Sequence, residues 1–556
     1  MNLSHILVAR GLLNESQLND ALALQRAEGL RLDRALVQLG LITEKQLLEL
    51  MSQQLDLPLV QLQDLTIEPD VLRSLPSKVV YRKRLVPISR ENGVLNVATS
   101  DAFDLYAFDD LRLSTGLDVR PVLAPRDDIE KLIKTHYGLG GDTLDEMVGA
   151  DGLEAMTNAV EGGEDLLEAA QEASVIKLVN EIIIEAVNER ASDIHIEPYE
   201  HQMSIRYRID GVLQEASVPP QMHRFQAAII SRIKILANLN IAERRIPQDG
   251  RIKFQVGGRQ VDVRVSVIPM LFGEGVVMRL LDKSNVLFTL QQLGMDDDTY
   301  GLFKGLIDRP HGIFLVTGPT GAGKTTTLYA ALNAIVGPGI KVLTVEDPVE
   351  YHLQGVNQIP VNHQVGMTFE KGLRAILRHD PDVVMIGEIR DLETARAATQ
   401  AAMTGHLVLS TLHTNDSASA AMRLVEMGVE PFLVSSTMIG AMAQRLVRRV
   451  CPKCREEYVP EPGTLPRDLI LAPGERLVRG TGCPHCRNTG YRGRSGLYEL
   501  LVMNEVIAEK IIERAPSPQI VAAGRSSGLR LLREDGWIKV RAGVTTPDEV
   551  VLCTAL

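Results

Sequence analysis

The sequence predicts an α/β fold with a mainly parallel sheet. Four short apolar runs have the length and composition of buried strands; they span residues 313–316, 342–345, 383–386 and 407–411. A glycine-rich loop follows the first run, and polar residues follow the other three. Because the carboxyl ends of parallel strands meet at one edge of the sheet, these endings are expected to converge on one ligand.

The glycine-rich loop has the full pattern of a phosphate-binding loop. It consists of Gly318, Pro319, Thr320, Gly321, Ala322, Gly323, Lys324 and Thr325. Thr326, where the helix-forming segment begins, is expected to join these residues in binding the nucleotide. Glycines let consecutive backbone N–H groups turn toward a polyphosphate at a helix N-terminus. Lys324 is expected to reach the β- and γ-phosphates, and the Thr325 hydroxyl to ligate Mg²⁺. The motif, with its strand and helix, predicts binding of a nucleoside triphosphate.

The other three apolar runs end in residues suited to triphosphate hydrolysis. Glu346 and Asp347 follow the second run, Glu388 follows the third, and His413 follows the fourth. Hydrolysis needs a base for the attacking water and acids that hold the water shell of the metal. We expect Glu388 to be the base, and Glu346 and Asp347 to position metal or water. A lone acid at a strand end is more often a helix cap, but two beside a phosphate loop favour catalysis.

Four arginines are candidates for stabilising the charge of the transition state. Arg264 lies on the polar face of an alternating strand whose valines share the other face. Arg279 interrupts an apolar run, which is costly for a cation unless it meets an anion. Arg374 and Arg378 lie four apart in an expected helix over 370–378, so they share a face. From spacing alone, ordinary surface salt bridges explain these arginines equally well.

Composition narrows the class of protein. The chain has 556 residues, 45% of them hydrophobic and 23% charged, which is typical of a soluble protein with several domains. No apolar run is long enough to span a bilayer, and the N-terminus lacks the basic region of a signal peptide, so a cytoplasmic location is expected. The net charge of −12 disfavours a nucleic-acid translocase.

Four of the five cysteines form two pairs with metal-site spacing. Cys451 and Cys454 make one CxxC pair, and Cys483 and Cys486 make another, 28 residues further on. Four thiolates at this spacing suit a closed tetrahedral Zn²⁺ site, and the Pro- and Gly-rich stretch between them would gain folding energy from the metal. A redox pair is the less favoured alternative.

Six motifs together resemble the secretion ATPases of type II secretion systems and type IV pilus assembly. They occupy residues 192–197, 246–251, 318–325, 345–350, 387–391 and 406–415. The resemblance extends from about residue 57 to the C-terminus. It implies a small, PAS-like sheet domain hinged to a RecA-like P-loop ATPase domain, six such subunits in a ring, and ATP with Mg²⁺ as cofactors. It also implies that Arg264, Arg279, Arg374 and Arg378 sense the γ-phosphate, and it places His406 and His413 in a histidine motif.

The same resemblance implies the partners and the machine. Members dock on an inner-membrane platform protein and on the cytoplasmic domain of a bitopic membrane component, so the chain is expected to be cytoplasmic and peripherally associated with the bacterial inner membrane. The cysteine module occurs in assembly and secretion members but not in pilus retraction members. Its short spacing favours pseudopilus assembly for type II secretion; a type IV pilus extension ATPase is the alternative, and a non-hydrolysing ring scaffold or sensor is a second one.

A 29-residue repeat occupies the first 54 residues. Leu3, Gly11 and Leu18 recur as Leu32, Gly40 and Leu47, and each copy predicts a short helix, a glycine turn, a capping residue and a second helix. The repeat resembles the MshE-type tandem motif that binds cyclic di-GMP. The resemblance departs from the motif because Asn2 and Ser4 replace an arginine and a glycine in the first copy, and Asp33 and Met51 replace a glycine and a leucine in the second, which retains Arg31. A helical docking domain for a membrane partner is an equal alternative.

These observations predict seven segments. They are a helical repeat domain (1–56), an α+β domain (57–138), an acidic linker (139–174), the small sheet domain (175–285), the ATPase domain (286–445), the zinc module (446–500) and a C-terminal helical region (501–556).

Overall fold

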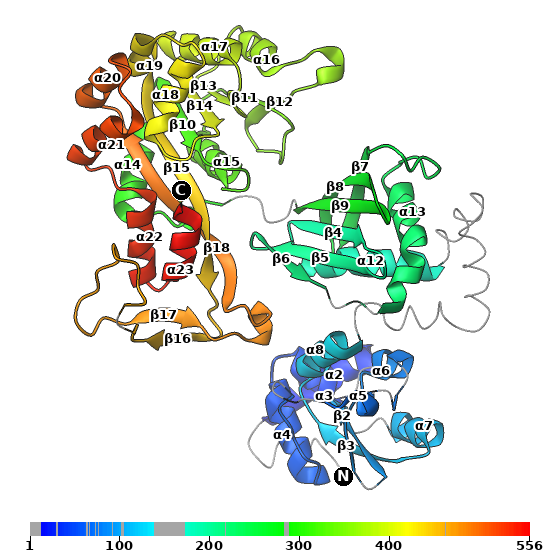
Figure 1. Ribbon diagram of the computed structural model, residues 1–556. Coiled ribbons are helices and arrows are strands. Elements are labelled where there is room, and N and C mark those ends of the chain that lie inside the picture. Colours follow the sequence, from blue (N-terminus) through cyan, green and yellow to red (C-terminus); the bar gives the residue numbers. More distant parts are fainter. Residues whose placement is uncertain are drawn as a thin grey trace. The chain divides into compact units, whose positions relative to one another are not determined.

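The computed structural model describes residues 13–137, 173–282 and 288–555, apart from short gaps at 29–31, 63–64, 66, 73, 76, 92, 102–104, 217, 219 and 462. The chain divides into two compact units. Figure 1 labels their helices and strands. The first comprises Met1–Val256 and Asp262–Leu280, and the second comprises Gly257–Val261 and Leu281–Leu556.

The first unit begins with helices and a small sheet. The helices are α2 (Glu15–Glu28), α3 (Leu32–Gln38), α4 (Glu44–Leu55), α5 (Pro69–Leu72), α6 (Ser77–Lys83), α7 (Leu105–Thr115) and α8 (Arg126–Tyr137). Strands β1 (Val86–Glu91), β2 (Val94–Thr99) and β3 (Asp118–Leu123) form a sheet in the order β1-β2-β3, antiparallel and then parallel.

The repeat pattern matches the observed capping. Thr43 caps α4 in a reciprocal capping box with Gln46, and Asn14 exchanges the same pair of hydrogen bonds with Gln17 at the start of α2. Gly40 makes the predicted turn with φ = 66°. Asn2, Ser4 and Arg31, as well as most of the expected acidic linker, lie outside the described residues.

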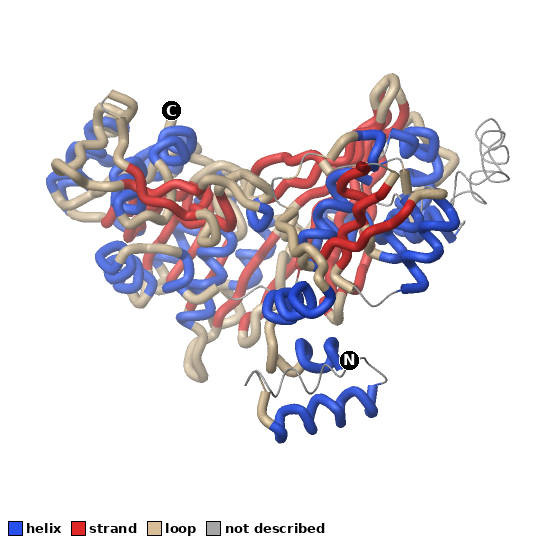
Figure 2. Tube along the Cα trace, turned by 90° about the horizontal axis from the view of Figure 1, so that it is seen from below, coloured by secondary structure: helices blue, strands red, loops and turns tan. Residues whose placement is uncertain are grey.

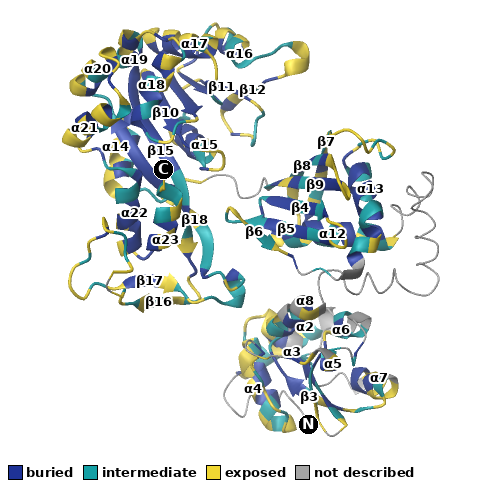
Figure 3. Cartoon of the chain, viewed as in Figure 1, coloured by how far each residue is buried: buried dark blue, intermediate teal, exposed yellow. Residues whose placement is uncertain are grey.

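The rest of the first unit is a six-stranded sheet with two helices. The helices are α12 (Ala173–Asn188) and α13 (Gln226–Leu236), with the short helix η1 (Pro220–Phe225) before α13; the strands are β4 (Asp193–Pro198), β5 (Met203–Ile209), β6 (Val212–Glu215), β7 (Gln248–Val256), β8 (Arg259–Met270) and β9 (Gly273–Asp282). Their order is β6-β5-β4-β9-β8-β7. As predicted, the four valines of β8 from Val261 to Val267 are buried, and Arg264 between them is partly exposed. Figure 3 colours the chain by burial and shows the inner strands of this sheet as largely buried.

The second unit contains the parallel sheet that the sequence predicts. Its strands are β10 (Gly312–Thr317), β11 (Val342–Glu346), β12 (Val356–Pro360), β13 (Val383–Ile386), β14 (Leu407–Leu412), β15 (Met438–Val450) and β18 (Tyr491–Val502). The order is β12-β11-β13-β14-β10-β15-β18, and only β18 is antiparallel to its neighbour. Alternate residues of β10 enter two separate hydrophobic cores, one on each face. Both faces are therefore covered, as a parallel sheet requires (Figure 2).

Helices cover this sheet and complete the C-terminal region. They are η3 (Leu290–Leu293), α14 (Asp297–Ile307), α15 (Lys324–Ile335), η4 (His363–Val365), α16 (Phe369–Ile376), α17 (Leu392–Met403), α18 (Ala418–Glu426), α19 (Pro431–Thr437), α20 (Glu505–Ile512), α21 (Ser517–Ser526), α22 (Leu532–Arg541) and α23 (Pro547–Thr554). Between β15 and β18 lie β16 (Arg455–Tyr458), β17 (Leu477–Gly480) and η5 (Pro484–Cys486). The segment boundary expected after residue 445 falls inside β15, and β18 belongs to the main sheet.

None of the helices in the described parts of the chain combines the length and the apolar character needed to cross a bilayer.

Candidate nucleotide and metal sites

The phosphate-binding loop connects β10 to α15 in the predicted way. Gly318 has φ = 144°, and a Cβ atom there would lie 2.5 Å from the backbone oxygen of Gln444. Gly323, immediately before α15, has φ = 88°. Both positions exclude ordinary side chains, so the loop needs these glycines for its shape. Thr325 lies exposed in the first turn of α15, where its hydroxyl is open to a metal ion.

The side chain of Lys324 folds back onto the phosphate-binding loop. Its Nζ donates hydrogen bonds to the carbonyl oxygens of Gly318 at 2.7 Å and Pro319 at 3.0 Å. Burial lowers the pKa of Lys324, and the positive charge of Arg445 acts in the same direction, whereas the carboxylate of Glu388 opposes them. The loop carbonyls thus accept the hydrogen bonds that phosphate oxygens would accept from a P-loop lysine.

Glu388 lies just beyond β13 at the carboxyl edge of the sheet. Its side chain is 14% exposed and forms an ion pair with Arg390. His413, which follows β14, has its Nε2 3.3 Å from Oε2 of Glu388. The structure therefore brings together Lys324, Glu388 and His413 from three strand ends, as the sequence predicts. A carboxylate in this place has the chemistry to accept a proton from water beside a bound triphosphate.

Glu346, at the end of β11, is more deeply buried and accepts hydrogen bonds on both carboxylate oxygens. It is 3% exposed. Tyr329 donates to its Oε2, while Thr344 Oγ1 at 2.5 Å and Gln358 Nε2 at 3.0 Å donate to its Oε1. Burial raises the pKa of Tyr329, and the negative charge of Glu346 adds to that rise. Three protein donors thus fix the carboxylate.

Asp347 extends the same polar edge. Its Oδ2 lies 3.1 Å from Nε2 of His363 on η4. The pKa of Arg390 is raised mainly by its hydrogen bond to Glu388 and additionally by the charge of Asp347. Arg390 therefore lies between the two acidic strand ends. His406 does not belong here, because it precedes β14 at the opposite edge and its Nδ1 lies 2.8 Å from the carbonyl oxygen of Ala401.

Two of the predicted arginines lie on the surface of the second unit. Arg374, on α16, forms an ion pair with Glu370 at 2.7 Å, and Arg378 donates to the carbonyl oxygen of Arg374 at 2.9 Å. The expected helix over 370–378 is too long at its C-terminal end, because α16 ends at Ile376 and Arg378 lies in the turn after it. Neither arginine forms a hydrogen bond or ion pair with the described residues of the phosphate-binding loop.

The other two predicted arginines belong to the first unit. Arg264 and Arg279 line an open cavity of about 590 Å³; Asp193, Asp249, Gly250, Arg251, Val265, Ser266 and Val277 complete its lining. Nε of Arg279 lies 3.0 Å from Oδ1 of Asp193, which is buried, and Nε of Arg208 lies 3.7 Å from Oδ2. The anion that Arg279 was expected to need is thus a carboxylate of the neighbouring strand β4.

The four paired cysteines form one cluster. Their Sγ atoms all lie within 4.8 Å of one another, and Cys451–Cys483 and Cys454–Cys486 are both separated by 3.8 Å. A tetrahedral zinc–sulfur distance of about 2.3 Å places neighbouring sulfur atoms about 3.8 Å apart, so this donor set fits Zn²⁺. Cys553 lies elsewhere, with its Sγ donating to the carbonyl oxygen of Leu446 at 3.3 Å.

Backbone groups also favour a thiolate in this cluster. Burial alone would raise the pKa of Cys486, but hydrogen bonds from the backbone N–H groups of Cys483 and Gly490 outweigh it and lower the pKa to about 7. Burial raises the pKa of Cys454 to about 12.

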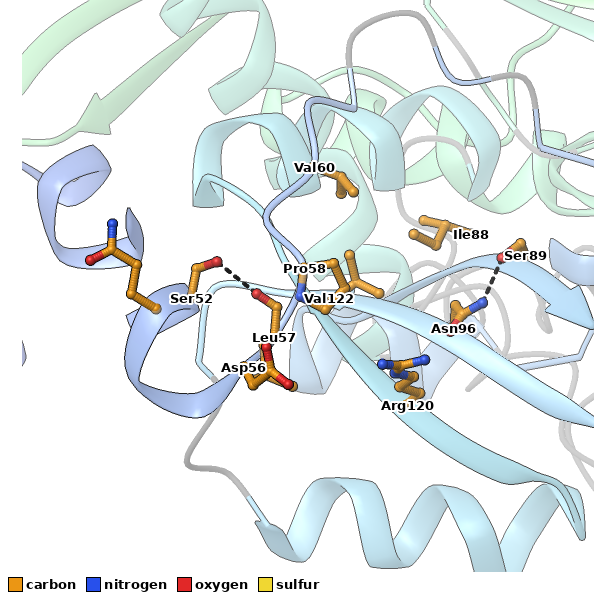
Figure 4. Close-up of a pocket in the computed structure, with 11 residues that line it drawn as sticks. Ser52, Asp56, Leu57, Pro58, Val60, Ile88, Ser89, Asn96, Arg120 and Val122 are labelled. Atoms are coloured by element: carbon orange, nitrogen blue, oxygen red, sulfur yellow. Dashed lines mark hydrogen bonds between the residues drawn. The ribbon is translucent and has the colours of Figure 1, made fainter. Parts of the chain in front are cut away.

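A separate cavity of about 710 Å³ lies in the N-terminal part of the first unit (Figure 4). Ser52, Gln53, Asp56, Leu57, Pro58 and Val60 form one wall, and Ile88, Ser89, Asn96, Arg120 and Val122 of the three-stranded sheet form the other. Ser52 Oγ donates to the carbonyl oxygen of Leu57 at 2.7 Å, and Asn96 donates to Ser89 at 2.8 Å.

Several polar residues around the phosphate-binding loop and the acidic strand ends were not predicted. They are Tyr329, Gln358, His363 and Arg445. Tyr329 lies five positions after Lys324 on α15, where the other buried residues are apolar or threonine. A tyrosine hydroxyl in such a core needs a hydrogen-bond partner, and this is the signal in the sequence that could have found it. The other three depend on strand pairing and could not be found from spacing.

Comparisons with known proteins identify the family of the chain. The sequence model of the family described as "Type II/IV secretion system protein" matches residues 168–552, and that of the MshEN domain matches residues 55–143. The chain is 43% identical over 562 residues to the type IV pilus assembly ATPase PilB of Myxococcus xanthus, covering 100% of this chain and 99% of that protein. It is 45% identical over 556 residues to the type II secretion system protein E of Xanthomonas campestris, covering 99% and 97%.

A solved structure is similar in fold. The ATPase DotB of Legionella pneumophila has a TM-score of 0.50 and 21% identity, over 67% of this chain and 94% of that one.

Proposed function

This chain belongs to the family of type II/IV secretion system proteins and is an ATPase of secretion and pilus assembly, and we propose that it powers assembly of a pseudopilus for type II protein secretion. The observation that carries the hydrolytic part of this proposal is the meeting of Lys324, Glu388 and His413 at one edge of a parallel sheet. In this proposal Glu388 is the base, and Glu346 and Asp347 position water or Mg²⁺. Thr325 would ligate Mg²⁺, and the loop would hold ATP.

The test of hydrolysis compares phosphate release by the wild-type protein and Glu388→Gln. The wild-type protein is expected to release phosphate steadily with Mg²⁺ and ATP, and the variant to bind ATP without turnover. A wild-type protein that binds ATP but releases no phosphate would favour a ring scaffold or sensor instead.

Assembly of a type IV pilus is the second candidate, because the pilus assembly ATPase of Myxococcus xanthus matches the whole chain. Support for the secretion branch comes from the short distance between the two cysteine pairs and from the whole-length match to a type II secretion protein. Deletion of the gene separates the two candidates. Loss of exported enzymes with intact pili would support secretion, and loss of pili with intact export would support pilus extension.

We propose a homo-hexamer because the resemblance to secretion ATPases implies one, and the distribution of the arginines is consistent with it. Arg264 and Arg279 belong to the first unit, whereas the phosphate-binding loop belongs to the second. In a ring, closure of one unit on the other would bring guanidinium groups to the γ-phosphate and produce the work step. Arg374 and Arg378 are proposed to join them there. Native mass spectrometry with Mg²⁺ and a non-hydrolysable ATP analogue is expected to show six copies.

We also propose a structural Zn²⁺ on the four clustered cysteines, and docking at the cytoplasmic face of the inner membrane through a platform protein and a bitopic component. Elemental analysis is expected to find one zinc per chain. Co-purification of the two membrane proteins with the tagged chain tests the docking. No role for nucleic acid is proposed, and DNA is expected not to stimulate hydrolysis.

Cyclic di-GMP is proposed as a regulator at the N-terminal repeat. The repeat lies directly before the residues that match the MshEN domain, and its second copy keeps Arg31, which would stack on and bond to guanine. Calorimetry of the full-length protein is expected to show binding that Arg31→Ala abolishes. Absence of binding in the wild-type protein would favour a docking role for the repeat.

A further inference from the structure

The strand β15 brings an arginine to the phosphate-binding loop. β15 runs parallel to β10, and their register pairs Thr317 with Ala443. Gln444 and Arg445 follow on β15 and therefore flank the start of the loop. A Cβ atom on Gly318 would lie 2.5 Å from the backbone oxygen of Gln444 and 3.3 Å from Nη1 of Arg445. The guanidinium of Arg445 thus lies against the first residue of the loop.

Three hydrogen bonds hold this guanidinium in place. Nη1 donates to the backbone oxygen of Gln444 at 3.1 Å, and Nη2 donates to the backbone oxygen and Oδ1 of Asn415 at 3.2 and 3.1 Å. A guanidinium has five N–H donors, so two remain without an acceptor in the described parts of the chain. Asn415 follows His413 by two residues, so Arg445 joins the loop after β14 to the phosphate-binding loop.

A second cation points to the same corner of the loop. Nζ of Lys324 bonds to the carbonyl oxygens of Gly318 and Pro319, at the end of the loop that Arg445 contacts. Both side chains are half-buried, and burial lowers the pKa of each. Carboxylates act against this positive charge, Glu388 at Lys324 and both Glu499 and Asp416 at Arg445. The two N–H donors of Arg445 that lack an acceptor in the described parts of the chain still suit an anion, and a P-loop lysine reaches the β- and γ-phosphates of a bound triphosphate.

We propose that Arg445 is a further nucleotide-binding residue, which contacts the terminal phosphates of ATP and makes the loop prefer ATP to ADP. The proposal rests on the proposed ATPase function. Arg264 and Arg279 lie in the first unit, whereas Arg445 lies in the unit that carries the loop, so its contact needs no closure of one unit on the other. It would therefore act on binding, in contrast to the arginines proposed to act on turnover.

The competing role is a structural brace. In that case Arg445 would only hold Asn415, and through it the loop that carries His413. If Arg445 is only a brace, its loss would weaken the binding of ATP and of ADP to the same extent. Asn415→Ala would then have the same effect on binding as removal of the Arg445 side chain. A phosphate contact would instead weaken the binding of the triphosphate selectively.

The experiment measures binding of two ligands by calorimetry with the full-length protein and Mg²⁺. The ligands are ADP and the non-hydrolysable ATP analogue AMP-PNP, and the variants are Arg445→Gln and Arg445→Lys. Arg449→Gln is the matched control, because Arg449 is exposed on the same strand. Arg445→Gln is expected to raise the Kd of AMP-PNP about tenfold or more, because this is the usual effect of losing a charge-assisted contact with phosphate. The Kd of ADP is expected to change less than about threefold.

The remaining variants keep the test decisive. Arg445→Lys keeps the positive charge but loses the planar guanidinium with its paired N–H donors. The affinity for AMP-PNP is therefore expected to lie between those of the wild-type protein and Arg445→Gln. The Arg449→Gln control is expected to match the wild-type protein. The proposal is overturned if Arg445→Gln weakens the binding of both ligands equally, or if it leaves the binding of AMP-PNP unchanged. Should Arg445→Gln not fold, as judged from its thermal unfolding, the same comparison with Arg445→Lys decides. Phosphate release by the wild-type protein tests the ATPase function separately.

Discussion

The hydroxyl of Tyr329 donates a hydrogen bond to the carboxylate of Glu346 and so connects the helix after the phosphate-binding loop to the end of the neighbouring strand. Both residues are buried, and Thr344 and Gln358 donate to the other carboxylate oxygen. A buried carboxylate that accepts hydrogen bonds on both oxygens is fixed in orientation. Movement of α15 on nucleotide binding would therefore be transmitted directly to Glu346.

Removal of that hydroxyl is expected to slow hydrolysis more than it weakens ATP binding. In Tyr329→Phe one oxygen of the buried carboxylate loses its donor, which costs about 1–3 kcal/mol of stability. We expect kcat to fall about tenfold and KM for ATP to change less than about threefold, because Lys324 and the loop are untouched. Tyr300→Phe is the control, since its hydroxyl lies at an exposed site and bonds only Gln291 among described residues. A fall in ATP affinity without a fall in kcat would contradict this role.

The two acidic strand ends are expected to differ in stability as well as in activity. Glu388→Gln should lower kcat by about 10²- to 10⁴-fold, the usual contribution of a general base, with an unchanged unfolding temperature. In Glu346→Gln the amide N–H₂ would take the place of one carboxylate oxygen and face the donor or donors of that oxygen, which are Tyr329 at Oε2 or Thr344 and Gln358 at Oε1. This variant should therefore also unfold at a lower temperature. Thermal unfolding and steady-state phosphate release measure both effects, with the surface change Glu426→Gln as control. Retained turnover in Glu388→Gln would transfer the role of base to Glu346.

The arginines of the first unit are expected to act on turnover and not on ATP binding. Arg264→Gln should lower kcat by about 10³-fold, as loss of a transition-state arginine does, while the Kd for AMP-PNP stays within about threefold. Lys253→Gln, an exposed change on the adjacent strand β7, should leave both unchanged. Calorimetry and phosphate release on the same preparations separate the two effects. Normal turnover in Arg264→Gln would remove the physical basis for the proposed work step.

Residues whose role follows from local pattern could be predicted from the sequence. The alternation of valines around Arg264 predicted β8, and the endings of β13 and β14 brought Glu388 and His413 together as expected. The carboxyl ends of parallel strands lie at one edge of the sheet, so a residue that follows such a strand in the sequence can be placed at that edge from the sequence pattern alone.

Residues whose role depends on pairing between distant segments could not be predicted. Arg279 was expected to need an anion, but the register of β4 with β9, which places Asp193 opposite Arg279, has no signal in either segment. Arg445 likewise depends on the pairing of β15 with β10. The end of α16 was placed two residues too far because helix ends depend on the capping geometry and not on the apolar period.

Metal binding by the cysteine cluster is expected to weaken as the pH falls. Zinc binds thiolates, so protons compete with it. The pKa of Cys486 is about 7 in the metal-free cluster, whereas burial raises that of Cys451 and raises that of Cys454 to about 12. Near neutral pH the metal must therefore displace protons from the thiols whose pKa is raised, and below about pH 7 from Cys486 as well. We expect the apparent zinc affinity, measured by competition with a chromogenic chelator, to fall at least tenfold per pH unit between pH 8 and 6, and the fall to steepen below pH 7. Cys553→Ser should leave this profile unchanged, because Cys553 lies outside the cluster. A zinc affinity independent of pH would show that the metal is not held by these thiolates.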